Sequence, residues 1–318
     1  MDRFCMGGQV ELEGKNIVVT GGTGTIGRAI VARLLKDHDP EWIVVLSRDA
    51  SKQNAMCREL DSARLKFMMG DVQNVDAVAE AVLGAHIVIH AAACKHVPAC
   101  EKFPREAIGV NITGSLNVLQ QSYWAGVDTC LAISTDKACE PVSVMGMTKA
   151  LMERLFVSYR WAMRTLCVRS GNVFGSRGSV VPLWRKQVEE GGPLTITDSR
   201  MVRYFISVES LVDDILQAIE FGNSGEIRVP KMALVYMGDL AEAMVEGTGV
   251  GIEEIGMRLG EKLTETLISP AEFPRTHEMP CGYVISPDKA GGISGVGESF
   301  LTKPEIRAML EEYERAGH

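Results

Sequence analysis

The stretch Lys15-Asn-Ile-Val-Val-Thr20, followed by Gly21-Gly-Thr-Gly-Thr-Ile-Gly27, determines the fold that this sequence predicts. The β-branched run indicates a short strand, and Arg28 to Leu35 has the apolar spacing of a helix. Glycines between a strand and a helix permit a tight turn, and the helix N-terminus offers amides to a pyrophosphate. We therefore interpret the segment as a dinucleotide-binding turn rather than a purely structural one. Its candidate cofactor-binding residues are Gly21, Thr23, Gly24, Thr25, Ile26 and Gly27.

Further short apolar runs follow this first unit and alternate with helical patterns. Six such strands predict an α/β fold with a doubly wound parallel sheet, the Rossmann arrangement. From Gly175 onward the pattern becomes irregular, which predicts a smaller, mixed C-terminal substrate lobe. We expect residues 1–174 to form the dinucleotide-binding domain, with a returning segment near 205–250, and residues 175–318 to form mainly the lobe and a tail. The five later strands are predicted at 42–46, 65–69, 87–93, 130–133 and 165–169.

Polar and small residues at the ends of these strands extend the predicted cofactor site. Arg48, beside Ser47, suits a ribose 2′-phosphate, which favours NADP over NAD, although Asp49 could instead bind a free ribose hydroxyl. Asp71 is placed to accept a hydrogen bond from the adenine amine. Asn111 lies in a predicted helix and either faces the cofactor crevice or is an ordinary surface residue. The other candidates here are Val72, Ala91, Ala92 and Ala93.

Composition limits the class of protein. A chain of 318 residues with 46% hydrophobic and 23% charged residues is typical of a globular protein. No apolar run reaches the roughly 18 residues of a membrane helix, and Met1 to Glu13 lacks a signal-peptide core, so we expect a cytoplasmic protein that binds no membrane. The net charge of −8 argues against nucleic acid as a partner. The eight cysteines and six histidines show no metal-ligand spacing, so we expect no metal and reduced thiols.

A second stretch, Ser134-Thr-Asp-Lys137, carries the predicted chemistry. It follows a predicted strand, and ligands bind at the carboxyl ends of strands in such sheets. Thr135, Asp136 and Lys137 thus bring a hydroxyl, a carboxylate and an amine to one edge, provided that the chain turns at residues 138–140. Met145 and Lys149 lie four residues apart, on one face of the next helix. Taken alone, the stretch could also be a polar turn with Asp136 as a local cap.

Basic residues cluster beyond Gly175, where they indicate an anion-binding lobe. The alternative is a set of solvated surface arginines. Lys95 lies in a loop after the fourth predicted strand and could likewise be solvated. The cluster comprises Arg177, Arg185, Lys186, Arg200 and Arg203.

Several motifs, in this order along the chain, resemble a known family. The glycine turn and Met145-x-x-x-Lys149 resemble the extended short-chain dehydrogenase/reductases. Within these, the chain is most similar to UDP-N-acetylglucosamine 4,6-dehydratases of the soluble capsular polysaccharide type, in which Met replaces the usual Tyr. The resemblance spans about residues 14–286. The more specific motifs are Ser134–Lys137, Arg169-Ser-Gly-Asn-Val173, Ser176-Arg-Gly-Ser-Val180 and Arg258-Leu-Gly-Glu-Lys262.

The resemblance implies a tightly bound, recycled NADP and a UDP-sugar substrate. C4 of the sugar is oxidised, water is lost across C5 and C6, and hydride returns to C6; some relatives also invert C5. Lys137 matches the C5 base, Asp136 the acid for the 6-hydroxyl and Thr135 a hydrogen-bonding partner, while Lys149 would bind the nicotinamide ribose. Relatives form homo-oligomers. The positions expected around the substrate are Lys95, Asn172, Ser179, Val180, Arg203, Arg258 and Glu261.

The missing Tyr leaves competing interpretations open. Met145 cannot transfer a proton, so Asp136, Lys149 or a water must take the C4 proton, or the hydride chemistry is lost. A UDP-hexosamine 4-epimerase is the alternative enzyme, although epimerisation gives Asp136 and Lys137 no task. An NADP-binding regulator without catalysis is the alternative from another class.

Overall fold

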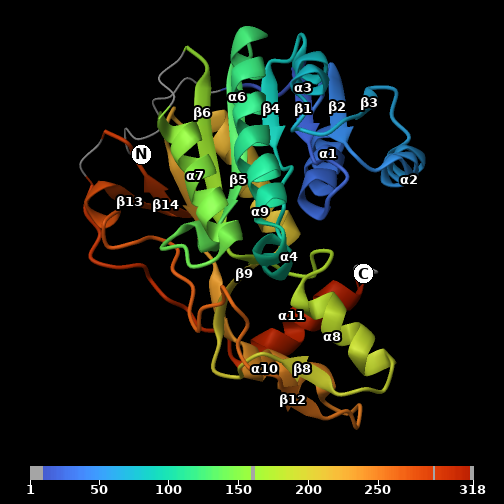
Figure 1. The fold of residues 1–318 in the computed structure, drawn as a ribbon, viewed down its shortest axis with the longest axis vertical. Coiled ribbons are helices and arrows are strands. Elements are labelled where there is room, and N and C mark those ends of the chain that lie inside the picture. The colour runs from blue at the N-terminus through green and yellow to red at the C-terminus, as the bar shows by residue number, and fades with distance from the viewer. Residues whose placement is uncertain (1–9, 159–161, 289–290, 316–318) are drawn as a thin grey trace.

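A nine-stranded sheet forms the centre of the molecule (Figure 1). The computed structural model describes residues 10–158, 162–288 and 291–315. The strand order is β13-β14-β10-β6-β5-β4-β1-β2-β3, and all neighbours from β3 to β10 are parallel. The strands are β1 (Asn16–Thr20), β2 (Trp42–Ser47), β3 (Leu65–Met69), β4 (Ile87–His90), β5 (Thr129–Thr135), β6 (Arg164–Ser170), β10 (Ile227–Pro230), β13 (Thr276–Met279) and β14 (Gly282–Ile285).

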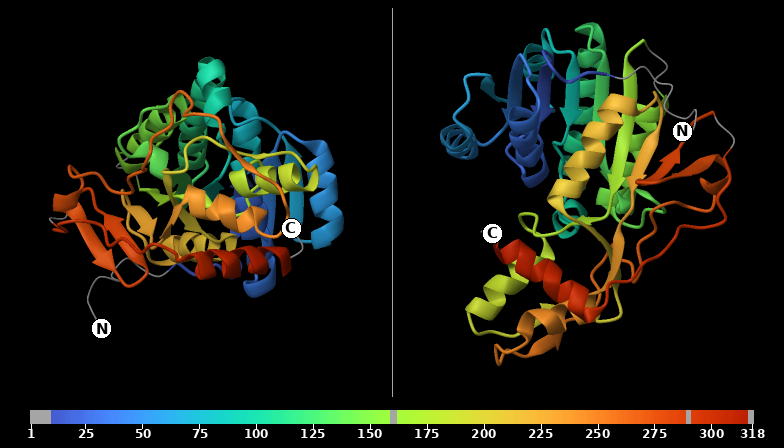
Figure 2. Two further views of the ribbon diagram at one scale, coloured as in Figure 1. Left: turned by 90° about the horizontal axis from the view of Figure 1, so that it is seen from below. Right: turned by 180° about the vertical axis from the view of Figure 1, so that it is seen from behind.

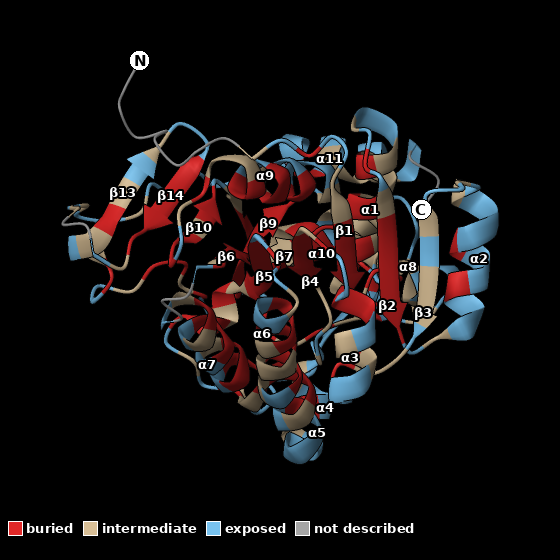
Figure 3. Ribbon diagram, turned by 90° about the horizontal axis from the view of Figure 1, so that it is seen from above, coloured by how far each residue is buried: buried red, intermediate tan, exposed pale blue. Residues whose placement is uncertain are grey.

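The central strands are apolar because helices cover both faces of the sheet. On one face α1 (Thr25–Asp37) and α9 (Val208–Phe221) share a buried core. On the other face lie α3 (Val75–Val82), α6 (Gly114–Trp124) and α7 (Val144–Ser158), packed on a second core. Figure 3 shows these two helical layers on either side of the buried strands. The predicted doubly wound α/β sheet is confirmed.

The strand order reverses between β1 and β4, which places a crevice at the carboxyl ends of the central strands. Val18 of β1 pairs with Val44 of β2 on one side and with Val88 of β4 on the other. The first crossover from β1 runs through α1 to β2, and the chain returns to β1's other side only with β4. The glycine turn and the end of β5 therefore open onto one edge of the sheet.

A smaller lobe lies beside that edge. It is seen below the sheet in Figure 1 and again, viewed from behind, in the right panel of Figure 2. Its core is formed by three helices and short strands, around Trp184, Leu240 and Ile306. The lobe and its neighbouring short sheets comprise α8 (Val180–Glu189), α10 (Met237–Val245), α11 (Lys303–Arg315), β7 (Asn172–Val173), β8 (Leu194–Ile196), β9 (Val202–Ile206), β11 (Ala233–Tyr236) and β12 (Ile252–Glu254).

The chain crosses between the main sheet and the lobe more often than the sequence indicated. Of the predicted returning segment 205–250, β10 joins the sheet and α9 packs against one face of it, whereas α10 packs in the core of the lobe. Residues 276–285 also return, as the antiparallel edge strands β13 and β14. The division at residue 174 remains a proposal, and residues 1–9 lie outside the described ranges.

Short elements complete the described chain. The predicted fourth strand is shorter than expected: it ends at His90, and Ala91 to Ala93 continue as a loop. None of the described helices is long and apolar enough to cross a membrane. The seven described cysteines are free thiols, and Cys5 falls in the undescribed start. The remaining elements are α2 (Ala50–Leu60), α4 (Val97–Lys102), α5 (Pro104–Ile108), the π-helix η1 (Gly109–Thr113) and the 3₁₀ turns η2 (Asp136–Ala138) and η3 (Phe273–Arg275).

Candidate active site

The end of β5 turns directly into η2, and this turn gathers the predicted catalytic residues. The turn begins at Asp136, not at the expected residues 138–140, and Cys139 N closes it on Asp136 O at 2.9 Å. Asp136 is fully buried, and its Oδ1 accepts from Thr135 Oγ1 at 2.8 Å and from Lys137 Nζ at 3.0 Å. Because the backbone is helical rather than extended here, adjacent side chains reach one point. The turn unites the hydroxyl, the carboxylate and the amine.

Lys137 has two further partners from distant parts of the chain. Its Nζ donates to Asn172 Oδ1 at 3.2 Å and lies 3.7 Å from Glu265 Oε1. Glu265 is buried, with 3% of its surface exposed, and its Oε2 lies 3.3 Å from Lys262 Nζ. No sequence motif marks Glu265. Its position four residues after Glu261 was the only local signal, and that spacing alone points to no function.

Helix α7 packs against this turn. A Cβ on Gly146 would come within 2.3 Å of Lys137 O, so only glycine permits the close approach. Met145 is buried in an apolar cluster with Cys100 and Ala107. Lys149 is also buried; its Nζ donates to Ile133 O at 2.6 Å, and burial lowers the pKa of Lys149 to about 8. Lys149 therefore lies beneath the crevice, attached to the β5 backbone.

The glycine turn has the geometry that a pyrophosphate requires. Gly21 has a φ of +66°, and a Cβ there would come within 2.7 Å of the Ala92 backbone. Gly24 is the N-cap of α1 and has no side chain that could accept hydrogen bonds from the first amides of the helix. A phosphate could accept from these amides instead. Thr23 and Gly27 are buried, Ile26 is partly buried, and Thr25 Oγ1 accepts from Arg177 N at 3.1 Å. The residues fit a dinucleotide.

At the end of β2, Arg48 and Asp71 lie together. The Arg48 guanidinium is 3.1 Å from Asp71 Oδ2 and 3.4 Å from Glu106 Oε1, and the Arg48 side chain is more than half exposed. Asp49 caps α2 instead, since its Oδ1 accepts from Lys52 N at 3.0 Å. Ser47 is buried and its hydroxyl accepts from Gln53 at 3.0 Å, while Val72 packs in the core. Arg48 is thus the accessible group at this strand end.

Asn111 holds the loop that begins with Ala91, Ala92 and Ala93. It is 1% exposed, so the surface alternative is wrong. Its Oδ1 accepts from Cys94 N at 2.7 Å, and its Nδ2 donates to Cys94 O at 3.0 Å and to Thr148 Oγ1 at 2.9 Å. With these bonds made, the side chain fixes the backbone of the loop.

The residues expected around the substrate fall into two groups. The first group lies along the segment 258–265: the Arg203 guanidinium donates to Lys262 O at 2.8 Å and to Leu263 O at 3.0 Å, and Glu261 Oε2 accepts from Arg258 N at 3.1 Å. The second group surrounds the start of α8, where Val180 is the first residue and the buried Ser179 hydroxyl has no hydrogen-bond partner within the described residues. Lys95 Nζ donates to Arg177 O at 2.7 Å in the same region.

The other basic residues of the lobe do not share this arrangement. Arg185 pairs with Glu314 at 3.1 Å, Lys186 with Glu190 at 3.6 Å and Arg200 with Asp198 at 2.7 Å. Each therefore has a carboxylate partner of its own.

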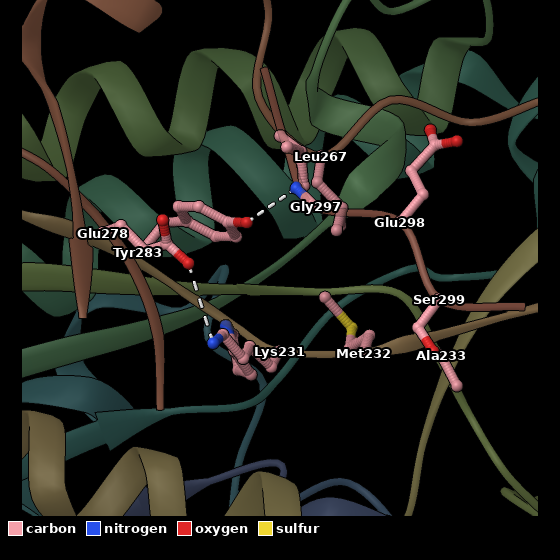
Figure 4. A pocket seen from close by; sticks show the side chains of 11 residues that line it. Lys231, Met232, Ala233, Leu267, Glu278, Tyr283, Gly297, Glu298 and Ser299 are labelled. Carbon is pink, nitrogen blue, oxygen red and sulfur yellow. Dashed lines mark hydrogen bonds and ion pairs between the residues drawn. The ribbon is translucent and has the colours of Figure 1, made fainter. Parts of the chain in front are cut away.

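A cavity of about 510 Å³ opens beside β10 and β14 (Figure 4). Its walls include Met232, Leu267 and Tyr283, and Tyr283 OH accepts from Gly297 N at 2.8 Å. None of the predicted site residues lines it. Tyr204 on β9 interacts electrostatically with Glu298 of the cavity wall and with Asp136 of the turn: its pKa is raised to about 12 by burial and then by these two carboxylates. Tyr204 is a second residue that no sequence pattern indicated.

The sheet, the glycine turn and the Met-x-x-x-Lys helix beside Thr135–Lys137 define an extended short-chain dehydrogenase/reductase. Within that class, the chain belongs to the family described as polysaccharide biosynthesis protein, whose model matches residues 17–287.

Curated relatives of similar identity have two different names. A UDP-N-acetylglucosamine 4,6-dehydratase (inverting) of Campylobacter jejuni is 41% identical over 279 residues, which are 86% of this chain and 83% of the relative. A UDP-glucose 4-epimerase of Rickettsia prowazekii is 39% identical over 310 residues, which are 94% of this chain and 90% of the relative.

Among solved structures, Pen from Bacillus thuringiensis superposes with a TM-score of 0.91 at 31% identity, covering 95% of this chain and 99% of that one. DesIV, a dTDP-glucose 4,6-dehydratase from Streptomyces venezuelae, has a TM-score of 0.74 at 22% identity, covering 80% and 89%, and shows the same fold.

Proposed function

We propose that the protein is an NADP-dependent dehydratase that converts a UDP-N-acetylhexosamine, UDP-N-acetylglucosamine first among them, to the 4-keto-6-deoxy sugar for surface-polysaccharide synthesis. One observation carries this proposal: a buried carboxylate and an amine, Asp136 and Lys137, meet at 3.0 Å at the carboxyl end of β5. Elimination of water needs one acid and one base, and the turn supplies both.

The residues of the chain can perform the proton transfers in order. Bound nicotinamide would accept a hydride from the sugar and later return it. Asp136 takes the proton of the C4 hydroxyl, and the resulting C4 ketone acidifies the proton at C5. Lys137 first removes that proton, which leaves an enolate, and Asp136 then donates its own proton to the departing 6-hydroxyl, so water leaves and the carboxylate is restored. Lys137 then returns a proton to C5. Thr135, which donates to Asp136 Oδ1 at 2.8 Å, orients the carboxylate throughout.

This sequence of steps assigns no proton transfer to Met145. The thioether packs with Cys100 and Ala107, as a spacer beside the sugar. Asp136 replaces the missing Tyr because its Oδ2 is buried without a hydrogen bond within the described residues, and so is free to accept a proton. Lys149 contributes positive charge beneath the nicotinamide ribose.

The choice of NADP rests on Arg48. Its guanidinium is more than half exposed and already faces the carboxylates of Asp71 and Glu106. A 2′-phosphate would bind the same guanidinium through charge-assisted hydrogen bonds. Asp49, which could have bound a free ribose hydroxyl, is engaged as the cap of α2.

The nucleotide of the substrate would bind to two kinds of anion-binding group. The first is the N-terminus of α8, near Lys95, with Val180 and with the Ser179 hydroxyl, which has no hydrogen-bond partner among the described residues. The second is the pair of arginines, Arg203 and Arg258, which with Glu261 would bind the diphosphate and ribose. Asn172, next to Lys137, would join the nucleotide side to the sugar side.

A UDP-hexosamine 4-epimerase is the second candidate, because the Rickettsia relatives have that name at 39–40% identity. Epimerisation uses the same cofactor but removes no water. It would leave the Asp136–Lys137 pair without a function.

The test is to incubate the purified protein with NADP and UDP-N-acetylglucosamine and to analyse the product by mass spectrometry. We expect a product that has lost water. A product of unchanged mass would identify an epimerase, and unchanged substrate would support a non-catalytic NADP-binding protein. Nuclear magnetic resonance of the product would then give the configuration at C5.

We also propose a homo-oligomer. Neighbouring helices expose large apolar side chains, Trp124 on α6 and Met147 and Leu151 on α7. Light scattering after size-exclusion chromatography measures the mass, and a monomer at micromolar concentration would contradict this proposal.

A further inference from the structure

The segment 258–265 is attached at three points, Gly260, Lys262 and Glu265, to the catalytic turn and the residues that follow it. Lys262 Nζ donates to Cys139 O at 3.0 Å and to Glu140 O at 2.9 Å, just after the turn. Gly260 lies so close to Ser143 that a Cβ would come within 2.9 Å of its side chain. The segment that carries Arg258 and Glu261 therefore also forms one wall around Lys137.

Glu265 is the residue of this segment that faces Lys137. Its side chain is 3% exposed, and its two oxygens lie 3.7 Å from Lys137 Nζ and 3.3 Å from Lys262 Nζ. Within the described residues, Oε2 has no hydrogen-bond donor. A carboxylate buried this deeply is costly unless cations balance it. Glu265 is thus held as a charge between two lysines.

The other charged groups around Lys137 show when the negative charge of Glu265 would be needed. Asp136 lies on the same turn, Lys262 and Glu265 on the segment 258–265, and Tyr204 on β9 near Asp136. Asn172 is neutral. During the proposed elimination Asp136 holds the proton that it will give to the 6-hydroxyl, so it is neutral when Lys137 becomes an ammonium. Among the described residues, the carboxylate that then remains beside that ammonium is Glu265.

We propose that Glu265 is a positioning residue for the elimination step: it is the counter-ion that favours the ammonium form of Lys137 while Asp136 is protonated. This inference rests on the proposed dehydratase function. It requires Glu265 to act through Lys137, without contact with the reacting carbons.

The experiment compares single-turnover water loss as a function of pH in the wild type and in Glu265→Gln. Without the negative charge, Lys137 loses its proton more readily, so the midpoint of the rise in rate with pH should fall by about one pH unit, a tenfold change in the neutral fraction. Glu140→Gln is the matched control: it removes an exposed carboxylate three residues from Lys137, and its midpoint should equal that of the wild type. A lower rate with an unchanged midpoint in Glu265→Gln would overturn the proposal.

A second measurement does not depend on activity. The rate at which acetic anhydride acylates Lys137, followed by mass spectrometry, reports the neutral amine directly. The midpoint of this rate should also be lower in Glu265→Gln, and Glu265→Asp, which keeps the charge on a shorter chain, should lie between the two proteins. If the wild type removes no water from any UDP-hexosamine, the proposed function fails, but the acylation rates still test the pairing. If a folded variant, Glu265→Gln or Glu265→Asp, had the same acylation midpoint as the wild type, the pairing of Glu265 with Lys137 would be contradicted.

Discussion

Two buried ionic clusters lie within the same fold, and they differ in how completely their hydrogen bonds are satisfied. In the first, Arg169 on β6 donates to both oxygens of Glu153 at 2.9 and 2.7 Å and to both oxygens of Glu272 at 3.0 and 2.9 Å. A fifth bond reaches Leu267 O at 2.7 Å. Burial alone would lower the pKa of Arg169, but the two carboxylates raise it well above its usual value. Every donor of this guanidinium has an acceptor.

The second cluster, at the catalytic turn, is incomplete. Asp136 Oδ2 and Glu265 Oε2 are buried and have no donor within the described residues. Unsatisfied buried polar groups are costly, and proteins retain them where function needs them. The comparison indicates that the Arg169 cluster is structural, because nothing remains for a ligand to bind, whereas the cluster of Asp136, Lys137 and Glu265 is prepared to exchange protons with one.

The largest expected effect lies in the incomplete cluster. Lys137→Ala should reduce dehydration by about 10²–10⁴-fold, the usual contribution of a general base. In deuterated water the wild type should give product deuterated at C5, whereas the variant should stall at a bound 4-keto sugar with reduced cofactor visible by absorbance.

Asp136→Asn should show almost no cofactor reduction. Reduction at the wild-type rate in Asp136→Asn would limit Asp136 to the elimination and leave Lys149 or a water as the C4 base.

The complete cluster should show the opposite behaviour. Arg169→Met leaves Glu153 and Glu272 buried and unpaired, so the free energy of unfolding should fall by about 3–5 kcal/mol. Urea denaturation measures this loss. Arg307→Met, which removes an exposed pair with Glu246, is the control and should cost less than about 1 kcal/mol. A small loss in Arg169→Met would mean that burial and complete hydrogen bonding do not distinguish the two clusters.

Lys149 lies between these extremes, since it is buried with a carbonyl acceptor and, within the described residues, has no hydrogen-bonded carboxylate. Its pKa of about 8 in the folded protein lies below its ordinary 10.5. Between these values the unfolded chain binds a proton that the folded chain does not, so the free energy of unfolding should rise with pH there. Relative to Lys149→Met, the wild type should gain up to about 3 kcal/mol between pH 8 and 10.5. Urea denaturation at several pH values tests this, and parallel curves for the two proteins would exclude it. Thiols that ionise in this range are present in both proteins and cancel.

The exposed pair of Arg48 and Asp71 should give the smallest effect. Arg48→Ala should weaken NADP by about 1.5–3 kcal/mol, tenfold or somewhat more in affinity, and NAD much less. Calorimetric titration of both cofactors tests this. Equal losses would remove the argument for a 2′-phosphate.

Local sequence patterns predicted much of the fold. The strand Leu65–Met69 has the predicted bounds, because it has a continuous local pattern between turn residues. Strands β13 and β14 were not predicted, since four-residue strands at a sheet edge acquire their identity from pairing with β10. Longer periodic segments carried enough information by themselves, and short edge segments did not.

The candidate site divides in the same way. Thr135, Asp136 and Lys137 were predicted because they are adjacent in sequence and end a strand. Glu265 was not, because its place beside Lys137 depends on how the segment 258–265 folds back over the turn. Asn111 was assigned to the crevice or the surface, and its bonds to Cys94 and Thr148 depend on two other elements. Contacts between distant segments are therefore the part that sequence patterns could not supply.

The Arg169 cluster also sets an order of events during synthesis. Arg169 and Glu153 are translated early, whereas Glu272 follows Arg169 by 103 residues. At about 5–20 residues per second, the ribosome needs roughly 5–20 s to deliver it. Until then the guanidinium has only part of its ligand shell, and the edge strands β13 and β14 do not yet exist. The nascent sheet can assemble early around its apolar strands, but it can close over its buried charges only after Glu272 has left the ribosome.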